Sequence, residues 1–312
     1  MNYGKIKPIT GTTRGEKIVQ YGEIITAKIT DENTSHYFVQ KEGQTFALDK
    51  NHTDGERYQL GEEIEGLIYE DMDHRPVIQI NLPDIRPGFF GWGTITQVRK
   101  DLGVFVDIGL YNKDVVVSLD DLPDDRSHWP QKSDRLYLTV MVDQKNRFWG
   151  QIANYEEIAK LFKPAPQRLM NQDVEARIFQ LKLAGAQMIT KEGYRAFIHE
   201  SEWILPPRLG QEVQARVTKV HPDGSLNLSL KPRAHEAIED DATMLLRLLD
   251  KSPDSFLPLH DKSDPEVIKS YLGISKGQFK RAVGSLLKEK KIRQEKEKGL
   301  YLIEKDDVSD TR

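Results

Sequence analysis

The 312-residue sequence contains no cysteine, and its apolar runs are short. Without cysteine, a disulfide framework, a thiol nucleophile and a zinc site with cysteine ligands are excluded. No run approaches the roughly 18 apolar residues that a membrane-spanning helix needs, so no membrane partner is expected. The first residues are not followed by an apolar segment of the kind found in secretory leaders. We therefore expect a soluble protein of the cytoplasm.

The composition is that of folded domains rather than of a disordered chain. Hydrophobic residues make up 38% of the sequence, and a prior of about 150 residues per domain suggests at least two domains. The net charge is only −4, but the charge is unevenly distributed. Residues 161–233 contain eleven Lys and Arg against seven Asp and Glu, and residues 275–298 contain nine against three. The second half can therefore attract phosphate groups although the whole chain is acidic.

From about residue 20 to residue 232, apolar and polar residues alternate in short runs that end at Gly, Pro, Asn or Asp. A period of two in short runs is typical of β-strands in small barrels or sandwiches. The same order of runs occurs three times, at a spacing of about 70 residues. We predict a first barrel in residues 1–82, ordered from about residue 18, a second in 83–155, a helix and linker in 156–168, and a third barrel in 169–233.

After residue 233 the apolar residues follow a helical period. One helical face carries Ile238, Ala242, Leu245 and Leu249. Asp264-Pro265 is a start signal for a second helix, and Ser275-x-x-Gln278 is a capping box for a third. Two short β-runs follow the third helix. Three helices and a hairpin predict a winged helix in residues 234–305, followed by an acidic tail in 306–312.

The three predicted barrels resemble S1 domains, which have the oligonucleotide-binding (OB) fold; the runs 102–105 and 197–199 carry much of this likeness. The order of three such domains and a winged helix resembles the conserved virulence factor B family of bacterial RNA-binding proteins. The fold class is accordingly expected to be mainly β with a C-terminal α+β domain, built from three tandem S1/OB-type five-stranded barrels and a winged helix. The resemblance implies RNA binding with regulatory effects rather than catalysis.

The resemblance also implies which residues of the second barrel contact RNA. S1 domains bind single strands on a face formed by strands 2 and 3, where aromatic rings stack on bases, helped by a His on strand 3 and an Asp-x-x-x-Arg turn. Phe105 matches the aromatic position, Ser118 stands where the His is expected, and Asp143 and Arg147 match the turn. The second barrel fits the pattern best, although its first aromatic is replaced by Leu102.

The other two barrels keep different parts of the pattern. The first keeps Phe38 with Tyr37 beside it, and Arg75 follows Asp71 at the spacing of the turn, but Leu48 stands where the His is expected. The third keeps His199, while Ala184 and Gln187 replace both aromatics. In the winged helix, phosphate contacts are expected from the basic residues Lys276, Lys280, Arg281, Lys288 and Arg293.

Because no barrel has the complete pattern, we expect weak binding by each and higher affinity from linking them. The expected partner is single-stranded RNA, with duplex nucleic acid through the winged helix as a further partner. We expect a monomer without cofactor or bound metal. We also expect no catalytic activity, because no phosphate loop, nucleophile elbow or zinc helix occurs in the sequence.

Purely structural interpretations of the same residues remain open. Phe38 and Phe105 could be core residues, His199 a surface residue with a backbone partner, and the Asp-x-x-x-Arg pairs simple turn ion pairs. The basic residues of the winged helix could form a solvated face. Three other functions also remain open: a DNA-binding transcription regulator, a protein-interaction scaffold, and a nuclease with metal ligands among the acidic residues of 71–74 and 120–125.

Overall fold

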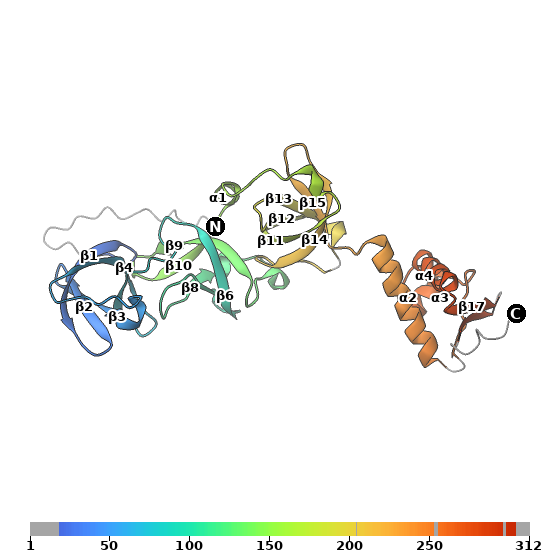
Figure 1. Ribbon diagram of the computed structural model, residues 1–312, viewed down its shortest axis with the longest axis horizontal. Helices are drawn as coiled ribbons and strands as arrows, with labels where there is room; N and C mark the ends of the chain where they lie inside the picture. The colour runs from blue at the N-terminus through green and yellow to red at the C-terminus, as the bar shows by residue number, and fades with distance from the viewer. Residues whose placement is uncertain (1–18, 204, 253–254, 296–297, 304–312) are drawn as a thin grey trace. The chain divides into compact units, whose positions relative to one another are not determined.

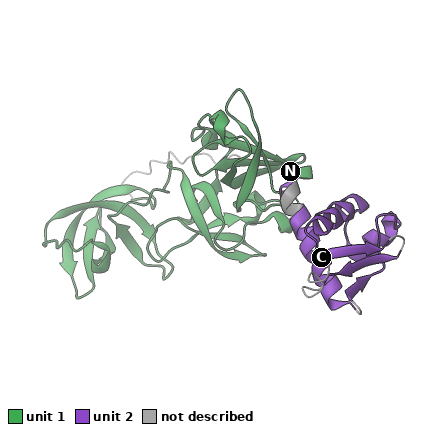
Figure 2. Cartoon of the chain, turned by 45° about the vertical axis from the view of Figure 1, so that its right-hand side comes forward, with its two compact units in different colours: residues 1–230 green, residues 231–312 purple. Residues whose placement is uncertain are grey.

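The computed structural model describes residues 19–203, 205–252, 255–295 and 298–303, except for the side chains of 234–237 (Figure 1). The expectations for the N-terminal residues before 18 and for the tail 306–312 lie outside these ranges. The chain forms two compact units, residues 1–230 and 231–312, coloured separately in Figure 2. The first unit contains three closed five-stranded barrels, which confirms the predicted fold class.

Barrel 1 has the strand order β1-β2-β3-β5-β4. Alternation along its strands turns one side chain of every two inward, and the buried ones include Val39, Phe46 and Ile68. Its strands are β1 (Ile24–Glu32), β2 (His36–Lys41), β3 (Gln44–Asp49), β4 (Glu63–Glu70) and β5 (Pro76–Gln79).

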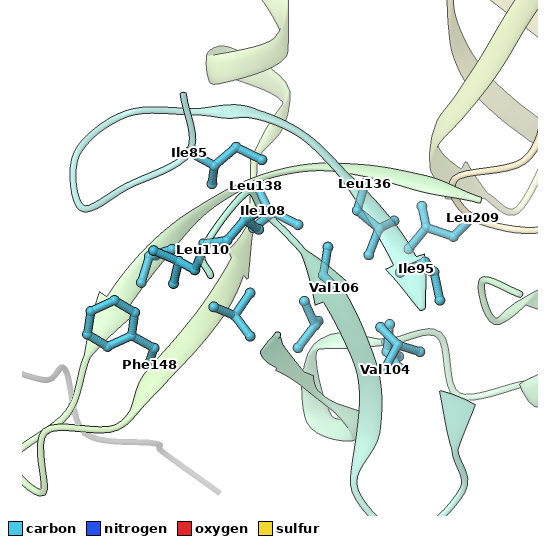
Figure 3. Packing of buried hydrophobic residues seen from close by; sticks show 14 of the residues in the cluster. Ile85, Ile95, Val104, Val106, Ile108, Leu110, Leu136, Leu138, Phe148 and Leu209 are labelled. Carbon is cyan, nitrogen blue, oxygen red and sulfur yellow. The ribbon is translucent and has the colours of Figure 1, made fainter. Parts of the chain in front are cut away.

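Barrel 2 repeats this order of strands. Its core gathers Val104, Val106, Leu136 and Leu138 from facing strands (Figure 3), and burying a side chain of this size contributes about 1.5–3 kcal/mol. Its strands are β6 (Gly91–Arg99), β7 (Gly103–Asp107), β8 (Val115–Ser118), β9 (Arg135–Val142) and β10 (Phe148–Ile152), and the short helix α1 (Tyr155–Ala159) follows.

Barrel 3 follows the linker and shares contacts with barrel 2. Arg208, in the loop before β14, forms an ion pair with Asp134 (3.1 Å), and Leu209 packs into the core of barrel 2. Barrels 1 and 2 are likewise joined, since the Tyr69 hydroxyl donates to the Tyr111 carbonyl at 2.9 Å. The strands of barrel 3 are β11 (Asp173–Lys182), β12 (Gly185–Thr190), β13 (Arg195–His199), β14 (Glu212–Val220) and β15 (Leu226–Ser229).

The second unit contains three helices and a small sheet. The sheet has the order β16-β18-β17, and its first strand was not expected from the sequence. The expected helix signals are present: Asp264 caps α3, Gly273 ends it in a left-handed conformation, and Ser275 and Gln278 form the capping box of α4. The elements are α2 (Ala234–Lys251), β16 (Phe256–Leu257), α3 (Pro265–Leu272), α4 (Lys276–Lys288), β17 (Ile292–Glu295) and β18 (Gly299–Leu302).

Candidate nucleic-acid interface

An outward-facing row of side chains crosses three neighbouring strands of barrel 2. Phe105 on β7 pairs with Val116 on β8, and Val116 pairs with Trp149 on β10. All three are half-buried, while their neighbours along each strand are buried in the barrel core. We call these three residues the outer row of barrel 2. It presents two aromatic rings on one face, which is the arrangement that stacks on unpaired bases.

The turn between β9 and β10 borders the outer row with a charged group. The Asp143 carboxylate accepts hydrogen bonds from the backbone N–H (3.0 Å) and Nε (2.8 Å) of Arg147, and from Trp149 Nε1 (3.1 Å). Burial alone would raise the pKa of Asp143, but these bonds outweigh burial and hold the pKa well below its usual range. The exposed Arg147 guanidinium lies 5.2 Å from the centroid of the Trp149 ring. It can therefore contact a phosphate or a base next to a stacked ring.

Trp149 was not singled out from the sequence. Only the parallel pairing of β10 with β8 brings it beside Val116 and into the same row as Phe105. The available signal is its position two residues after the arginine of the Asp-x-x-x-Arg turn.

Ser118 and His199 occupy the same place in their barrels. Ser118 pairs with Gly103 and His199 with Gly185, and both glycines have positive φ angles, 133° and 153°. A short 3-10 turn follows each of the two residues, Leu119–Asp121 after Ser118 and Glu200–Glu202 after His199. The side chain of Ser118 or His199 accepts a hydrogen bond from a backbone N–H of its turn and so caps it. The His199 Nδ1 atom accepts from the Ser201 N–H at 3.2 Å, so the backbone-partner interpretation holds for this atom.

In barrel 1 the corresponding residue is Asp49, not Leu48. Asp49 pairs with His36, and its side chain caps the 3-10 turn Lys50–His52 through the Asn51 N–H. Leu48 points into the core and is 1% exposed. The expectation that Leu48 stands at the His position is therefore off by one residue, which in a strand means the opposite face.

In barrel 3 the outward-facing aromatic residue lies on the third strand instead of the second. Gln187 on β12 occupies the place of Phe105, and its partner across the ladder is Phe197, which pairs in turn with Asn227 on β15. These three half-buried residues are the outer row of barrel 3. The β14–β15 turn carries His221 in the place of Asp143, bonded to Asn227 at 3.1 Å. The sequence comparison looked for an aromatic on strand 2 and therefore missed Phe197.

In barrel 1 the outer row is Phe38, Ala47 and Val77. Phe38 is half-buried, whereas the adjacent Tyr37 is 5% exposed and packs in the barrel core. Tyr37 thus has no open ring face on which a base could stack. Arg75 donates from Nε to Asp71 at 3.0 Å and is exposed.

One end of this barrel 1 face is occupied by the β7–β8 loop of barrel 2. The Tyr111 ring stacks on the His52 ring with centroids 3.6 Å apart, and the Asn112 amide donates to Asp73 at 3.1 Å. The surface around Arg75 is therefore bordered by Tyr111 and Asn112 of barrel 2.

Helix α4 of the second unit presents a basic face. Lys280, Arg281 and Lys288 are exposed and Lys276 is half-buried, while Phe279, Ala282, Val283 and Leu286 pack inward. Gly277 and Gly284 interrupt the basic face and leave backbone open to close approach. Arg293 on β17 differs, because it forms an ion pair with Glu295 and lies 4.2 Å from the Tyr301 ring centroid.

Two further classes of feature are a metal centre and a membrane-spanning helix. Within the ranges that the structure describes, no group of three or more His, Asp or Glu residues is arranged to hold a metal ion. Asp71, one of the candidate nuclease ligands, is instead engaged by Arg75. None of the helices in these ranges is long and apolar enough to cross a membrane.

Family models match four consecutive parts of the chain. An S1 domain matches residues 21–80, the CvfB first S1-like domain matches 90–151, the second domain of virulence regulatory factor CvfB matches 158–232, and the CvfB-like winged helix domain matches 243–302. The chain is also 36% identical over 240 residues to conserved virulence factor B of Staphylococcus aureus (strain N315), covering 77% of this chain and 79% of that protein. The chain belongs to the conserved virulence factor B family.

Other relatives cover more of the chain. An uncharacterized protein of Bacillus subtilis (strain 168), YitL, is 36% identical over 90% of this chain and 94% of its own. A crystal structure of a multidomain protein with nucleic acid binding domains from Streptococcus pneumoniae has 44% identity and a TM-score of 0.66, covering 91% of this chain and 98% of that one. S1 and winged-helix domains are nucleic-acid-binding domains rather than enzyme families, so this member of the conserved virulence factor B family is a nucleic-acid-binding protein.

Proposed function

We propose that this protein binds single-stranded RNA in the cytoplasm, without catalysis, and regulates gene expression after transcription. The observation that carries the proposal is the outer row of barrel 2, where Phe105 and Trp149 face outward on either side of Val116. Bases of a single strand are unpaired and can stack on such rings, whereas the bases of a duplex are already stacked on one another. Arg147, held by Asp143 beside Trp149, adds a cation at the edge of this surface.

The other domains contribute further contacts to the same strand. In barrel 1 these come from Phe38 and Arg75, and in barrel 3 from His199 and Phe197. Tyr37 lies in the core of barrel 1 and contributes no contact to the strand. The phosphate contacts come from Lys276, Lys280, Arg281 and Lys288 of α4, while Arg293, already paired, adds less. Linking several modest sites in one monomer gives an affinity that no single domain reaches.

A second candidate function, duplex binding, is favoured by α4. Its exposed cations and its two glycines allow close approach to a phosphodiester backbone. With one winged helix per chain, a duplex reader of this kind would need a second copy to reach a second half-site.

The test measures binding of a fluorescent oligouridylate, the matching oligodeoxyuridylate and a DNA duplex by fluorescence anisotropy. Phe105→Ala should raise the Kd for oligouridylate about 5- to 150-fold, because one stacked base contributes about 1–3 kcal/mol. The matched control is Phe89→Ala, which removes a phenylalanine that is 53% exposed but lies outside the outer rows, and it should leave the Kd unchanged.

Three outcomes would contradict the proposal. Equal Kd values for oligouridylate and oligodeoxyuridylate would show single-strand binding without RNA preference. A duplex preference that is lost only in Lys276→Glu/Lys280→Glu would make the winged helix the reading domain. The absence of salt-dependent binding to all three ligands would leave a protein-interaction scaffold.

A further inference from the structure

Barrel 2 has a second surface feature directly beside its outer row. A groove of about 430 Å³ lies between β6 and the loop that precedes β9. Its apolar part is formed by Val98, Trp129 and Pro130, and Val98 is exposed. A volume of this size falls within the usual range for a small-molecule site, so the groove can hold a nucleotide.

The charged residues that line this groove are all cationic. They are Lys100, Arg126 and Lys132, and no carboxylate contributes to the lining. All three are exposed, and none forms an ion pair within the described part of the chain. Arg126 donates to the Lys100 carbonyl at 3.4 Å and lies 5.7 Å from the Trp129 ring centroid, so it joins the two sides of the groove.

Two carboxylates near the groove are already engaged by other cations. Asp101 pairs with Arg99 at 2.7 Å, and Asp134 pairs with Arg208. In a chain of net charge −4, three unpaired cations around an apolar floor form a local site for an anion that also carries an apolar surface.

The groove is continuous with the outer row. Gln97, which lines the groove, pairs across the β6–β7 ladder with Phe105. The Thr96 hydroxyl, also in the lining, donates to the Asp114 carboxylate at 2.6 Å. Gln97 therefore lies both beside Phe105 and in the groove, while the next residue, Val98, pairs with Val104 and lies on the other face of β6.

We propose that this groove binds one nucleotide of the single strand next to the base stacked on Phe105, with its base over Val98 and Pro130 and its phosphate at Lys100, Arg126 and Lys132. This inference rests on the proposed function and extends it to a second site on the same barrel. The shared chemistry is a nucleotide phosphate, which a bound strand or a free mononucleotide can supply.

The first test uses the salt dependence of oligouridylate binding. The double variant Lys100→Ala/Lys132→Ala should lower the slope of log Kd against log salt concentration by up to about 0.7, since the one phosphate that this site holds on a single strand contributes about 0.7. The control Lys28→Ala/Lys251→Ala removes the same charge from β1 and α2, which carry none of the proposed contacts. The control should change the slope by much less, and equal changes in the two variants would overturn the inference.

The second test follows the four tryptophan indole N–H signals by NMR, assigned from single Trp→Phe variants of the full chain. Oligouridylate should shift the signals of both Trp129 and Trp149, and the lysine variant should lose only the Trp129 shift. Uridine monophosphate that shifts Trp129 alone, in a lysine-dependent way, would support the site and identify the free nucleotide as its ligand.

Failure of the inference and failure of the proposed function give different spectra. A shift of the Trp149 signal without a shift of the Trp129 signal, together with an unchanged salt slope, would contradict nucleotide binding in the groove but not RNA binding by the outer row. No shift of either signal would overturn both.

Discussion

Barrels 2 and 3 have the same strand order and equivalent residue pairs, yet they place their aromatic residues on different strands. Barrel 2 carries Phe105 on the second strand and Trp149 on the fifth, whereas barrel 3 carries Phe197 on the third. The inward residues on either side stay apolar and buried in both barrels. Because the core specifies only the inward side chains, the outer row can change without altering the barrel. The same fold can therefore carry surfaces of different binding affinity within one chain.

The largest expected effect concerns a feature that the two barrels share. Gly103 and Gly185 have φ angles that other residues rarely adopt, and a Cβ atom at either would clash with a carbonyl oxygen of the third strand. Gly103→Ala should therefore lower the free energy of unfolding by about 3 kcal/mol. Tryptophan fluorescence during urea unfolding reports this directly, because all four tryptophans lie in 92–203.

A second glycine of barrel 2 serves as a control that distinguishes the steric clash of a Cβ atom from the cost of a positive φ angle. Gly109 also has a positive φ (87°), but a Cβ there would meet Pro83 only at ordinary contact distance. Gly109→Ala should cost about 1 kcal/mol. Equal losses for the two variants would mean that the close approach at Gly103 does not stabilise the barrel.

The next effect tests whether the position of the aromatic matters. Phe197→Ala should raise the Kd for oligouridylate at least about fivefold, through the loss of about 1 kcal/mol of stacking. Adding Gln187→Phe places the ring where barrel 2 carries it and should restore the Kd to within about twofold of wild type. Anisotropy titrations of the single and double variants measure both steps. If the first substitution has no effect, barrel 3 does not bind through its outer row.

A smaller effect is expected at the Asp143–Arg147 turn, where barrel 3 carries His221 and Ser225 instead. Asp143→Asn weakens the hydrogen bonds from Arg147 and Trp149, and it should lower the free energy of unfolding by about 1 kcal/mol at neutral pH. The folded protein lowers the pKa of Asp143, so its contribution is complete above the ordinary aspartate pKa of about 3.9 and declines as the pH falls below that value.

Urea unfolding at several pH values checks this dependence. The difference between wild type and Asp143→Asn should be constant above about pH 5 and shrink below about pH 4. A difference that stays constant down to pH 2 would show that the lowered pKa does not stabilise the fold.

The smallest expected effect concerns the roles of Ser118 and His199, which occupy the same place in barrels 2 and 3. Ser118→Ala removes the side-chain cap of a three-residue turn and should cost about 0.5 kcal/mol, with a change in Kd below about threefold. Ser118→His transfers the barrel 3 residue to barrel 2 and should tighten oligouridylate binding if the histidine contacts RNA. A looser complex would indicate that His199 only caps its turn.

The sequence alone predicted the features that depend on local periodicity. Alternating runs specified the strands, the capping box at Ser275 and Gln278 specified the start of α4, and the repeated order specified three barrels. The family also followed from this order. These features need no knowledge of distant contacts, since neighbouring residues along the chain determine them.

What the sequence could not determine is which residues meet across strands. Tyr37 and Phe38 are adjacent aromatics, and only the register of β2 buries the first and leaves the second half-buried on the outer face. The register likewise puts Asp49 rather than Leu48 beside His36. Trp149 joins Phe105 only through the parallel pairing of β10 and β8, two strands that are distant in sequence. A pairing shift of one residue turns every side chain to the other face, so only the tertiary structure could decide which side chains form the binding surface.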